Sequence, residues 1–337
     1  MHCCAILSYA FVGPIIMKAV VRILESLPRN FGAFVSEVSA AMRDIFGEEA
    51  GCYYCDVMEQ GFLANLAHPD VEVLGIMDGA HLAAYALSVR REDYGEIPFV
   101  HVLRRFEGQG LEIALIREAA RRLRDAGARR ILCEVVPACR MELDAALLPI
   151  GFDRIARQLM RAPLDAPALC RTPGSTAAGE AECLGDMAAC LADAYVGHPE
   201  RDLHNEALDA ARAEAYLRRV EAGEYGCSHP GYLRAAYVNG LCAGMAAACE
   251  TPPGWGFVLH VAVARAFQGR GIGQALLVEL ARVFRANGLK HMGLGVSLDN
   301  PARRLYERLG FRPLCAISTY IRREAPGATA EGNPSWP

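Results

Sequence analysis

The chain contains an internal repeat with a nearly constant spacing, and this repeat constrains its fold more than any other feature. Asp78-Gly79 and Asn239-Gly240 each separate two apolar runs, which is typical of a hairpin turn, and the two glycines lie 161 positions apart (240 − 79). The same spacing relates Phe106 to Phe267, Gly110 to Gly271 and Gly127 to Gly288, and the final Gly-Phe pairs, Gly151-Phe152 and Gly310-Phe311, are 159 apart (310 − 151). The sequence therefore predicts two copies of one unit of about 140–150 residues, a normal domain size.

A segment rich in proline and small polar residues joins the two units. Residues 163–167 and 172–176 combine prolines with glycine, serine and threonine and show no hydrophobic periodicity, as in linkers and exposed crossovers. We therefore expect an N-terminal extension (1–16), a first domain (17–163), a linker (164–179), a second domain (180–324) and a flexible C-terminal tail (325–337).

Composition narrows the class of protein. Apolar residues make up 53% of the chain and charged residues 22%, which is ample core material for two globular domains, and the net charge of −4 argues against a nucleic-acid-binding surface. The thirteen cysteines are scattered, and the single Cys-x-x-Cys at residues 52–55 has no partner pair at zinc spacing. We therefore expect reduced thiols, no metal and a cytoplasmic location. No stretch reaches the ~18–20 apolar residues of a membrane span, and residues 2–17 lack the preceding positive charge of a signal peptide.

A glycine-rich turn lies between a strand pattern and a helix pattern in the second unit. Residues 257–263 are apolar and β-branched, Gln268-Gly269-Arg270-Gly271-Ile272-Gly273 follows, and apolar residues then recur at helical spacing. Such a turn gathers backbone N–H groups at a helix N-terminus and can bind a phosphate. A dinucleotide site would place the turn after the first strand, with an acidic residue about 20 positions later, and a nucleoside-triphosphate loop would need Gly-Lys-Ser/Thr. The sequence fits neither pattern.

Asn300, Tyr306 and the pair Gly310-Phe311 follow the turn in that order. With the turn, they resemble the GNAT superfamily of acyl-CoA-dependent N-acyltransferases, whose motif is Gln/Arg-x-x-Gly-x-Gly/Ala followed by an Asn, a Tyr and a Gly-Phe pair. The resemblance implies an α+β fold of two tandem GNAT-like domains, each a mostly antiparallel central sheet flanked by helices. It also implies that strands four and five of the sheet separate and admit the pantetheine arm of the cofactor.

The resemblance also implies roles for individual residues. The backbone of the turn would bind the pyrophosphate of acetyl-CoA, and the strand before it would bind the pantetheine as an added strand. Tyr306 would protonate the departing thiolate as a general acid, although a tyrosine on an amphipathic helix is also a common core residue. The cofactor-binding residues expected on this basis are Val261, Val263, Gln268, Gly269, Arg270, Gly271, Ile272, Gly273 and Asn300, the last of them on the cofactor arm.

The acceptor side of the site has weaker signals. By the resemblance, the loop between the first two helices of the unit shapes it, which here spans residues 195–204. Its aromatic, imidazole and carboxylate groups suit an ammonium-bearing acceptor, and a solvated polar loop fits them equally well. The candidate acceptor-binding residues are Tyr195, His198, Glu200 and His204.

His260 lies on the strand before the turn and is a tempting general base. Bases of the family on this strand would fall at Phe257 or Leu259, which are apolar here. His260 has the opposite parity and so should point to the other sheet face, unless a bulge intervenes. We therefore interpret His260 as a hydrogen-bonded core histidine and assign no general base.

The first unit lacks the polar residues of the motif. Glu107 and Glu112 occupy the positions of Gln268 and Gly273, where two carboxylates would repel a pyrophosphate, and Leu147 corresponds to Tyr306. We interpret this unit as a degenerate copy that packs on its partner and walls the acceptor site. Binding of a different ligand by this copy remains an open alternative.

These features predict an N-acyltransferase that moves acetyl from acetyl-CoA to a primary amine by direct attack in a ternary complex. No cysteine stands in the motif as an acyl carrier. The alternative is a non-catalytic acyl-CoA sensor or assembly module, against which the retained Tyr306 argues. We expect a small-molecule or peptide amine as acceptor, no nucleic-acid or membrane partner, and a monomer or homodimer.

Overall fold

The computed structural model describes residues 19–91, 93–134, 143–170, 178–180, 183–251 and 254–323. The predicted extension (1–16), the predicted tail (325–337) and residues 171–177 of the predicted linker lie outside the described residues.

The two halves of the chain follow the same order of elements. The first half contains β1 (Val21–Ile23), α1 (Phe31–Phe46), α2 (Glu48–Ala67), β2 (Val71–Asp78), β3 (His81–Arg90), β4 (Tyr94–Val102), α3 (Leu111–Asp125), β5 (Arg130–Glu134), α4 (Asp144–Leu147) and β6 (Asp153–Pro163). The second half contains β7 (Ala178–Glu180), α5 (Leu184–Ala194), α6 (Ala210–Glu221), β8 (Leu233–Val238), β9 (Leu241–Thr251), β10 (Trp255–Val263), α7 (Ile272–Ala286), β11 (His291–Ser297), α8 (Arg303–Arg308) and β12 (Arg312–Arg323).

The repeat is confirmed at the level of whole elements. β10 and α7 begin and end where the repeat spacing places the counterparts of β4 and α3. Each helix follows a glycine in the left-handed region, Gly110 (φ 72°) and Gly271 (φ 79°), where a side chain would be strained. The fold is α+β, as expected, and among the described strands only the β4–β5 and β10–β11 pairs are parallel.

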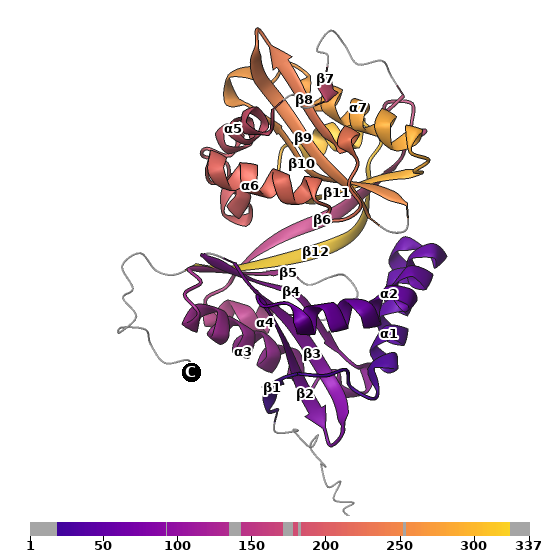
Figure 1. The fold of residues 1–337 in the computed structure, drawn as a ribbon, viewed down its shortest axis with the longest axis vertical. Helices are drawn as coiled ribbons and strands as arrows, with labels where there is room; N and C mark the ends of the chain where they lie inside the picture. The colour runs from indigo at the N-terminus through magenta and orange to yellow at the C-terminus, as the bar shows by residue number, and fades with distance from the viewer. Residues whose placement is uncertain are drawn as a thin grey trace, which may run out of the picture.

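The two halves exchange their last strands. The described strands form one sheet in the order β1-β2-β3-β4-β5-β12-β6-β11-β10-β9-β8-β7. β6, from the first half, pairs with β11, whereas β12, from the end of the chain, pairs with β5. β6 and β12 also pair with each other and bridge the two lobes of the molecule (Figure 1). The predicted boundary at residues 164–179 therefore divides the chain but not the sheet.

β10 and β11 separate after four paired positions. Their parallel pairing covers Trp255 to Val258 only, although the strands continue to Val263 and Ser297. The expected separation of these strands is therefore present. β10 also contains a bulge, because its register against β9 shifts between Val258 and His260. The extra residue, Leu259, reverses the side-chain alternation that follows it.

The two faces of the sheet in the second half carry different cores. α7 packs on one face, where Gly256 lies so close to Phe284 that an added β-carbon would be 2.3 Å from the ring. α5 and α6 pack on the other face. After the bulge, Val261 packs with the α7 core and Ala262 with the α5–α6 core. No helix in the described ranges is both long and apolar enough to cross a membrane.

Candidate active site

The glycine turn of the second half presents open backbone. A β-carbon added to Gly269 or Gly271 would meet no atom within 4 Å among the described residues. α7 starts at Ile272 without a side-chain cap, so its first N–H groups are available to an anion. The turn therefore fits a pyrophosphate, as its sequence predicts.

The two polar side chains of the turn bond to the backbone that precedes it. Nε2 of Gln268 donates to the Val263 carbonyl (3.2 Å), and Nη2 of Arg270 donates to the Ala266 carbonyl (3.0 Å). These bonds hold the turn against the end of β10.

A cavity of about 820 Å³ runs from the turn, between β10 and β11, to the loop at residues 195–204. Arg270 is the one predicted site residue that does not line it; all the other predicted cofactor-binding and acceptor-binding residues do, as does Tyr306. The cavity thus joins the predicted phosphate end to the predicted acceptor end. The cavity is also lined by five polar residues for which the sequence indicated no role at the site, Glu134, Arg157, His260, Gln274 and Arg308.

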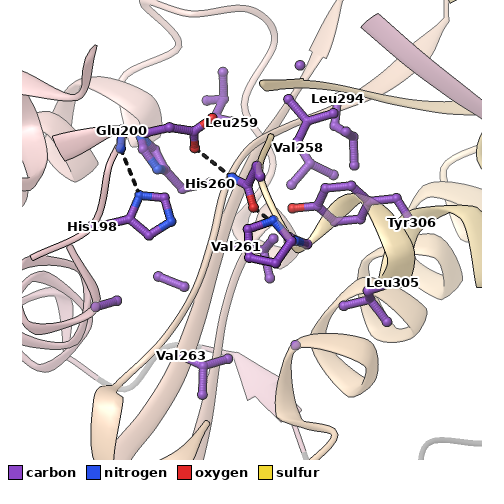
Figure 2. A pocket seen from close by; sticks show the side chains of 18 of the residues that line it. His198, Glu200, Val258, Leu259, His260, Val261, Val263, Leu294, Leu305 and Tyr306 are labelled. Atoms are coloured by element: carbon purple, nitrogen blue, oxygen red, sulfur yellow. Dashed lines mark hydrogen bonds between the residues drawn. The ribbon is translucent and has the colours of Figure 1, made fainter. Parts of the chain in front are cut away.

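Tyr306 projects from α8 into this cavity, and Figure 2 shows its ring reaching toward β10. The residue is 7% exposed, packs on Phe311 (ring centroids 5.9 Å apart), and its hydroxyl has no hydrogen-bond partner within the described chain. Burial and the nearby Glu200 carboxylate raise the pKa of Tyr306. The hydroxyl therefore stays protonated at neutral pH and can act as a proton donor.

Glu200 places a carboxylate at the acceptor end of the cavity. Its oxygens accept hydrogen bonds from the Ser297 amide (3.2 Å) and from Nδ2 of Asn300 (2.7 Å). Burial raises the pKa of Glu200, but these two bonds and the nearby His204 and Arg157 outweigh burial, so the pKa is lowered. Glu200 is therefore ionised at neutral pH.

Asn300 connects this carboxylate to the helix that carries Tyr306. Its Oδ1 accepts a hydrogen bond from the Ala302 amide (2.9 Å), while its Nδ2 donates to Glu200. Asn300 therefore caps the turn that precedes α8, which begins at Arg303. Its amide is already bonded to protein groups at the cavity wall.

Four side chains from β10, from the loop at residues 195–204 and from just beyond this loop form a hydrogen-bonded cluster. Oε1 of Glu206 lies 2.7 Å from Nε2 of His260 and 3.0 Å from Nδ1 of His204, and the Tyr195 hydroxyl lies 3.4 Å from Nδ1 of His260. Burial raises the pKa of Glu206, but the hydrogen bonds from the two imidazoles outweigh burial and lower it. Burial lowers the pKa of His260 more than Glu206 raises it. Glu206 is therefore ionised and His260 neutral.

The orientation expected for His260 is wrong, although its burial and hydrogen bonding are confirmed. The bulge at Leu259 turns its ring to the α5–α6 face, against Tyr195 and Tyr216 (ring centroids 5.9 and 5.3 Å away). Pro98 occupies the position equivalent to Leu259 in the first copy and could have revealed the bulge, because proline within a strand marks an edge or a bulge. Sequence reasoning also missed Glu206, which lies just beyond the predicted acceptor loop.

The first half contributes two charged residues to the cavity. Arg157 lies on the exchanged strand β6, and Glu134 ends β5. Nη1 of Arg157 lies 2.5 Å from Oε2 of Glu134, which also accepts a hydrogen bond from the Thr319 hydroxyl (2.6 Å). The first half therefore forms part of the cavity wall, through residues that the local sequence did not indicate.

The match to a known family covers most of the residues that line this cavity. Residues 200–311 match the model of the acetyltransferase (GNAT) family. The second half of the chain therefore contains a GNAT domain. The matched residues include the glycine turn, Tyr306 and three members of the cluster, His204, Glu206 and His260, whereas Tyr195 lies just before the matched segment. The match supports acyl transfer as the general chemistry of this half of the chain.

Solved GNAT structures share the fold over most of the chain. A GCN5-related N-acetyltransferase from Sphaerobacter thermophilus matches with a TM-score of 0.66 at 22% identity, covering 92% of this chain and 97% of that one. A tandem GNAT protein from the clavulanic acid biosynthesis pathway matches with a TM-score of 0.58 at 16% identity, covering 92% and 100%. These identities establish the fold alone, and the tandem GNAT arrangement is confirmed. No curated protein matches the sequence.

Proposed function

We propose that this protein transfers an acetyl group from acetyl-CoA to a primary amine by direct attack in a ternary complex. The observation that carries the proposal is the position of Tyr306. Its hydroxyl, which has no partner in the described chain, lies in a cavity between an open glycine turn and a carboxylate-bearing loop. A proton donor is useful there because a departing thiolate, with a pKa near 8.5, is a better leaving group when protonated.

The turn and the separated strands form the donor end of the site. The open amides of the turn would hold the pyrophosphate. Among the described strands, none pairs with the edge of β10 that faces β11 after Val258, so Val261 and Val263 can pair with an extended arm. Bound acetyl-CoA supplies a thioester whose carbonyl carbon the amine attacks. Tyr306 donates its hydroxyl proton to the departing sulfur.

The acceptor end suits a group that carries positive charge. Glu200 offers an ionised carboxylate, and the rings of Tyr195, His198 and His204 surround the same space, with the centroid of Tyr195 5.0 Å from each of the two imidazoles. An ammonium group is stabilised by a carboxylate and by aromatic faces. We therefore infer a small-molecule or peptide amine as the acceptor.

The lining of the cavity favours direct transfer. None of the cavity residues in the described ranges is a cysteine, so no thiol is placed to carry the acyl group. The acceptor amine and the thioester must therefore occupy the cavity at the same time.

The alternative is a non-catalytic acyl-CoA sensor, which would use the turn but has no use for the hydroxyl of Tyr306. The test is incubation with acetyl-CoA and a panel of amines (polyamines, amino sugars, aminoglycosides and peptide N-termini), with detection of free CoA thiol. Calorimetric titration with acetyl-CoA should show one site per chain. Binding without thiol release for every amine would favour the sensor, and two equivalent sites would contradict a degenerate first unit.

A further inference from the structure

A line of hydrogen bonds leads from the cavity into the core of the second half. We propose that Tyr195, His260 and Glu206 form a proton relay that takes the proton from the ammonium group of the acceptor. The proposal rests on the proposed function, because an amine that arrives as ammonium must lose a proton before it attacks a thioester. The relay would act as the general base, a role that no residue of the sequence motif fills.

Tyr195 is the member of the relay that the acceptor can reach. Tyr195 and His260 both line the cavity, but the His260 side chain is only 3% exposed. The Tyr195 hydroxyl is 3.4 Å from Nδ1 of His260, which is long for such a bond. Hydrogen bonds of this kind are often long in ligand-free sites and tighten only in the complex.

The carboxylate fixes the tautomer of His260. An ionised carboxylate can only accept, so Nε2 of His260, 2.7 Å from Oε1 of Glu206, carries the hydrogen. Nδ1 then holds the lone pair and accepts from the Tyr195 hydroxyl. Both links are therefore oriented to move a proton from the cavity to His260.

The surroundings of His260 favour a neutral ring that can take a proton. Burial, His204 and Arg157 lower the pKa of His260, and the hydrogen bond to Glu206 raises it. Glu206 stabilises the imidazolium once it forms, as a carboxylate does behind other catalytic histidines. The ionisable groups that face the ring are Glu206, His204, Tyr195, Tyr216 and Arg157.

The step balances in protons and charge. An N–H bond of the ammonium group breaks and its proton goes to the Tyr195 oxygen, while the proton of the Tyr195 hydroxyl goes to Nδ1 of His260. The products are a neutral amine, a neutral tyrosine and an imidazolium paired with Glu206. His260 returns its proton to solvent by the reverse path after the product leaves.

Glu200 is a weaker candidate for this role. Both of its oxygens already accept hydrogen bonds, and its lowered pKa suits the binding of an ammonium group better than removal of a proton from it. A metal site is a second alternative, since ligand atoms of His204, Glu206 and His260 lie within 4.8 Å of one another. The two nitrogens, however, lie 2.7 and 3.0 Å from a single carboxylate oxygen, at the distances of direct hydrogen bonds.

Three variants separate a relay from a structural role. Tyr195→Phe and His260→Gln each remove one link and keep most of the packing. Tyr216→Phe is the control, because this buried tyrosine touches the His260 ring (centroids 5.3 Å apart) but does not line the cavity. With an acceptor amine identified by thiol release, we expect kcat/KM at pH 7 to fall about 10²–10⁴-fold in the first two variants and to stay unchanged in the control.

The pH profile is the decisive readout. In both relay variants, log kcat/KM should rise by about one unit per pH unit up to the pKa of the acceptor itself, because only amine that is already neutral in solution can react. The wild-type profile should level off at a lower pH. A wild-type profile in folded Tyr195→Phe or His260→Gln protein would overturn the relay.

Two further measurements complete the test. NMR of ligand-free protein labelled with ¹⁵N-histidine should show His260 as the Nε2–H tautomer, and an Nδ1–H tautomer would overturn the proposal. Wild-type activity should survive treatment with a chelator, and loss of activity that added Zn²⁺ restores would replace the relay with a metal site. No thiol release by the wild type with any amine would instead overturn the proposed function, and the relay with it.

Discussion

The two halves of this protein share a backbone arrangement and differ in the side chains that it carries. In both, the strand before the glycine turn pairs with the next parallel strand over four positions, Tyr94–Ile97 in the first half and Trp255–Val258 in the second. In both, the two glycines of the turn adopt φ between 72° and 79°. The first half therefore retains the backbone of the cofactor site that we propose in the second.

Side chains account for the difference. Phe99 occupies the position equivalent to His260, and its ring packs on Tyr85 (centroids 4.9 Å apart), which in turn contacts Phe31, Phe34 and Phe62. These aromatic rings occupy the face that carries the hydrogen-bonded cluster around His260 in the second half. The turn of the first half carries Glu107 and Glu112. The comparison supports our interpretation of the first half as scaffold, because its turn and strands lack the polar side chains found in the second half.

The largest contrast should appear on adding a carboxylate to each turn. Gly271→Glu should abolish acetyl-CoA binding, because like charges 4 Å apart at an effective dielectric constant of 20 repel by about 4 kcal/mol, roughly a thousandfold in Kd. Gly110→Glu is the matched control in the first half and should leave the affinity unchanged. Calorimetry on folded samples, checked by circular dichroism, measures both. Loss of affinity in Gly110→Glu would show that the first half binds the cofactor.

Removing the Tyr306 hydroxyl should affect turnover but not binding. Tyr306→Phe keeps the ring packed on Phe311 and should lower kcat about 10²–10⁴-fold, with the Kd of acetyl-CoA within a few-fold of wild type. Tyr232→Phe is the control, since Tyr232 is a buried tyrosine that contacts Phe284 and does not line the cavity. Wild-type kcat in Tyr306→Phe would mean that water or another group protonates the thiolate.

Equivalent glycines under the two long helices should differ in tolerance. A β-carbon on Gly256 would lie 2.3 Å from the Phe284 ring, and one on Gly95 would lie 2.7 Å from Leu123, at positions related by the repeat. Gly256→Ala should lower the free energy of unfolding by about 1–3 kcal/mol, and Gly95→Ala by less, because a leucine changes rotamer more readily than a ring in a packed core. Denaturant titration of both variants measures this. Phe284→Leu should partly restore Gly256→Ala, and equal losses in both halves would contradict the argument.

The smallest expected effect is a shared loss of stability in acid. Each half buries a histidine beside a glutamate, His101 with Glu37 and His260 with Glu206, and burial lowers the pKa of both histidines. The unfolded chain then binds more protons than the folded chain below pH 6.5. The contribution of each histidine to the free energy of unfolding is therefore fully present above that pH and is lost as the pH falls. The slope is at most about 1.4 kcal/mol per pH unit for each histidine. His101→Gln and His260→Gln should each reduce the slope between pH 6.5 and 5, and an unchanged slope in either variant would exclude that histidine.

The sequence predicts the local parts of this structure well, and for clear physical reasons. The glycine turn, the amphipathic helix after it and the hairpin turns depend on residues that lie close together in the chain. They can therefore be predicted from the sequence alone. The repeat spacing holds through both ends of β10 and α7. Local pattern and family resemblance together also indicated the loop that holds Tyr195 and Glu200 beside Tyr306.

Features that depend on pairing between strands far apart in the sequence could not be predicted. The exchange of β6 and β12 pairs strands from opposite halves of the chain. No local sequence pattern shows whether a strand pairs within its own half or with the other half. Arg157 and Glu134 enter the cavity through this exchange and were therefore missed. The error at His260 had a smaller cause, a single inserted residue in β10 that reversed the alternation on which parity arguments rely.

The strand exchange also explains why an eroded copy would persist. A chain cut between β6 and β7 would give two fragments, each lacking the strand that completes its sheet and each ending in a strand that belongs to the other. Such fragments are complementary pieces rather than independent domains. Loss of the first copy would take β6 away from β11 and leave the edge of the catalytic sheet unpaired. Because its last strand completes the sheet of the second half, the first copy can lose its functional side chains without harm to the fold, but it cannot be deleted.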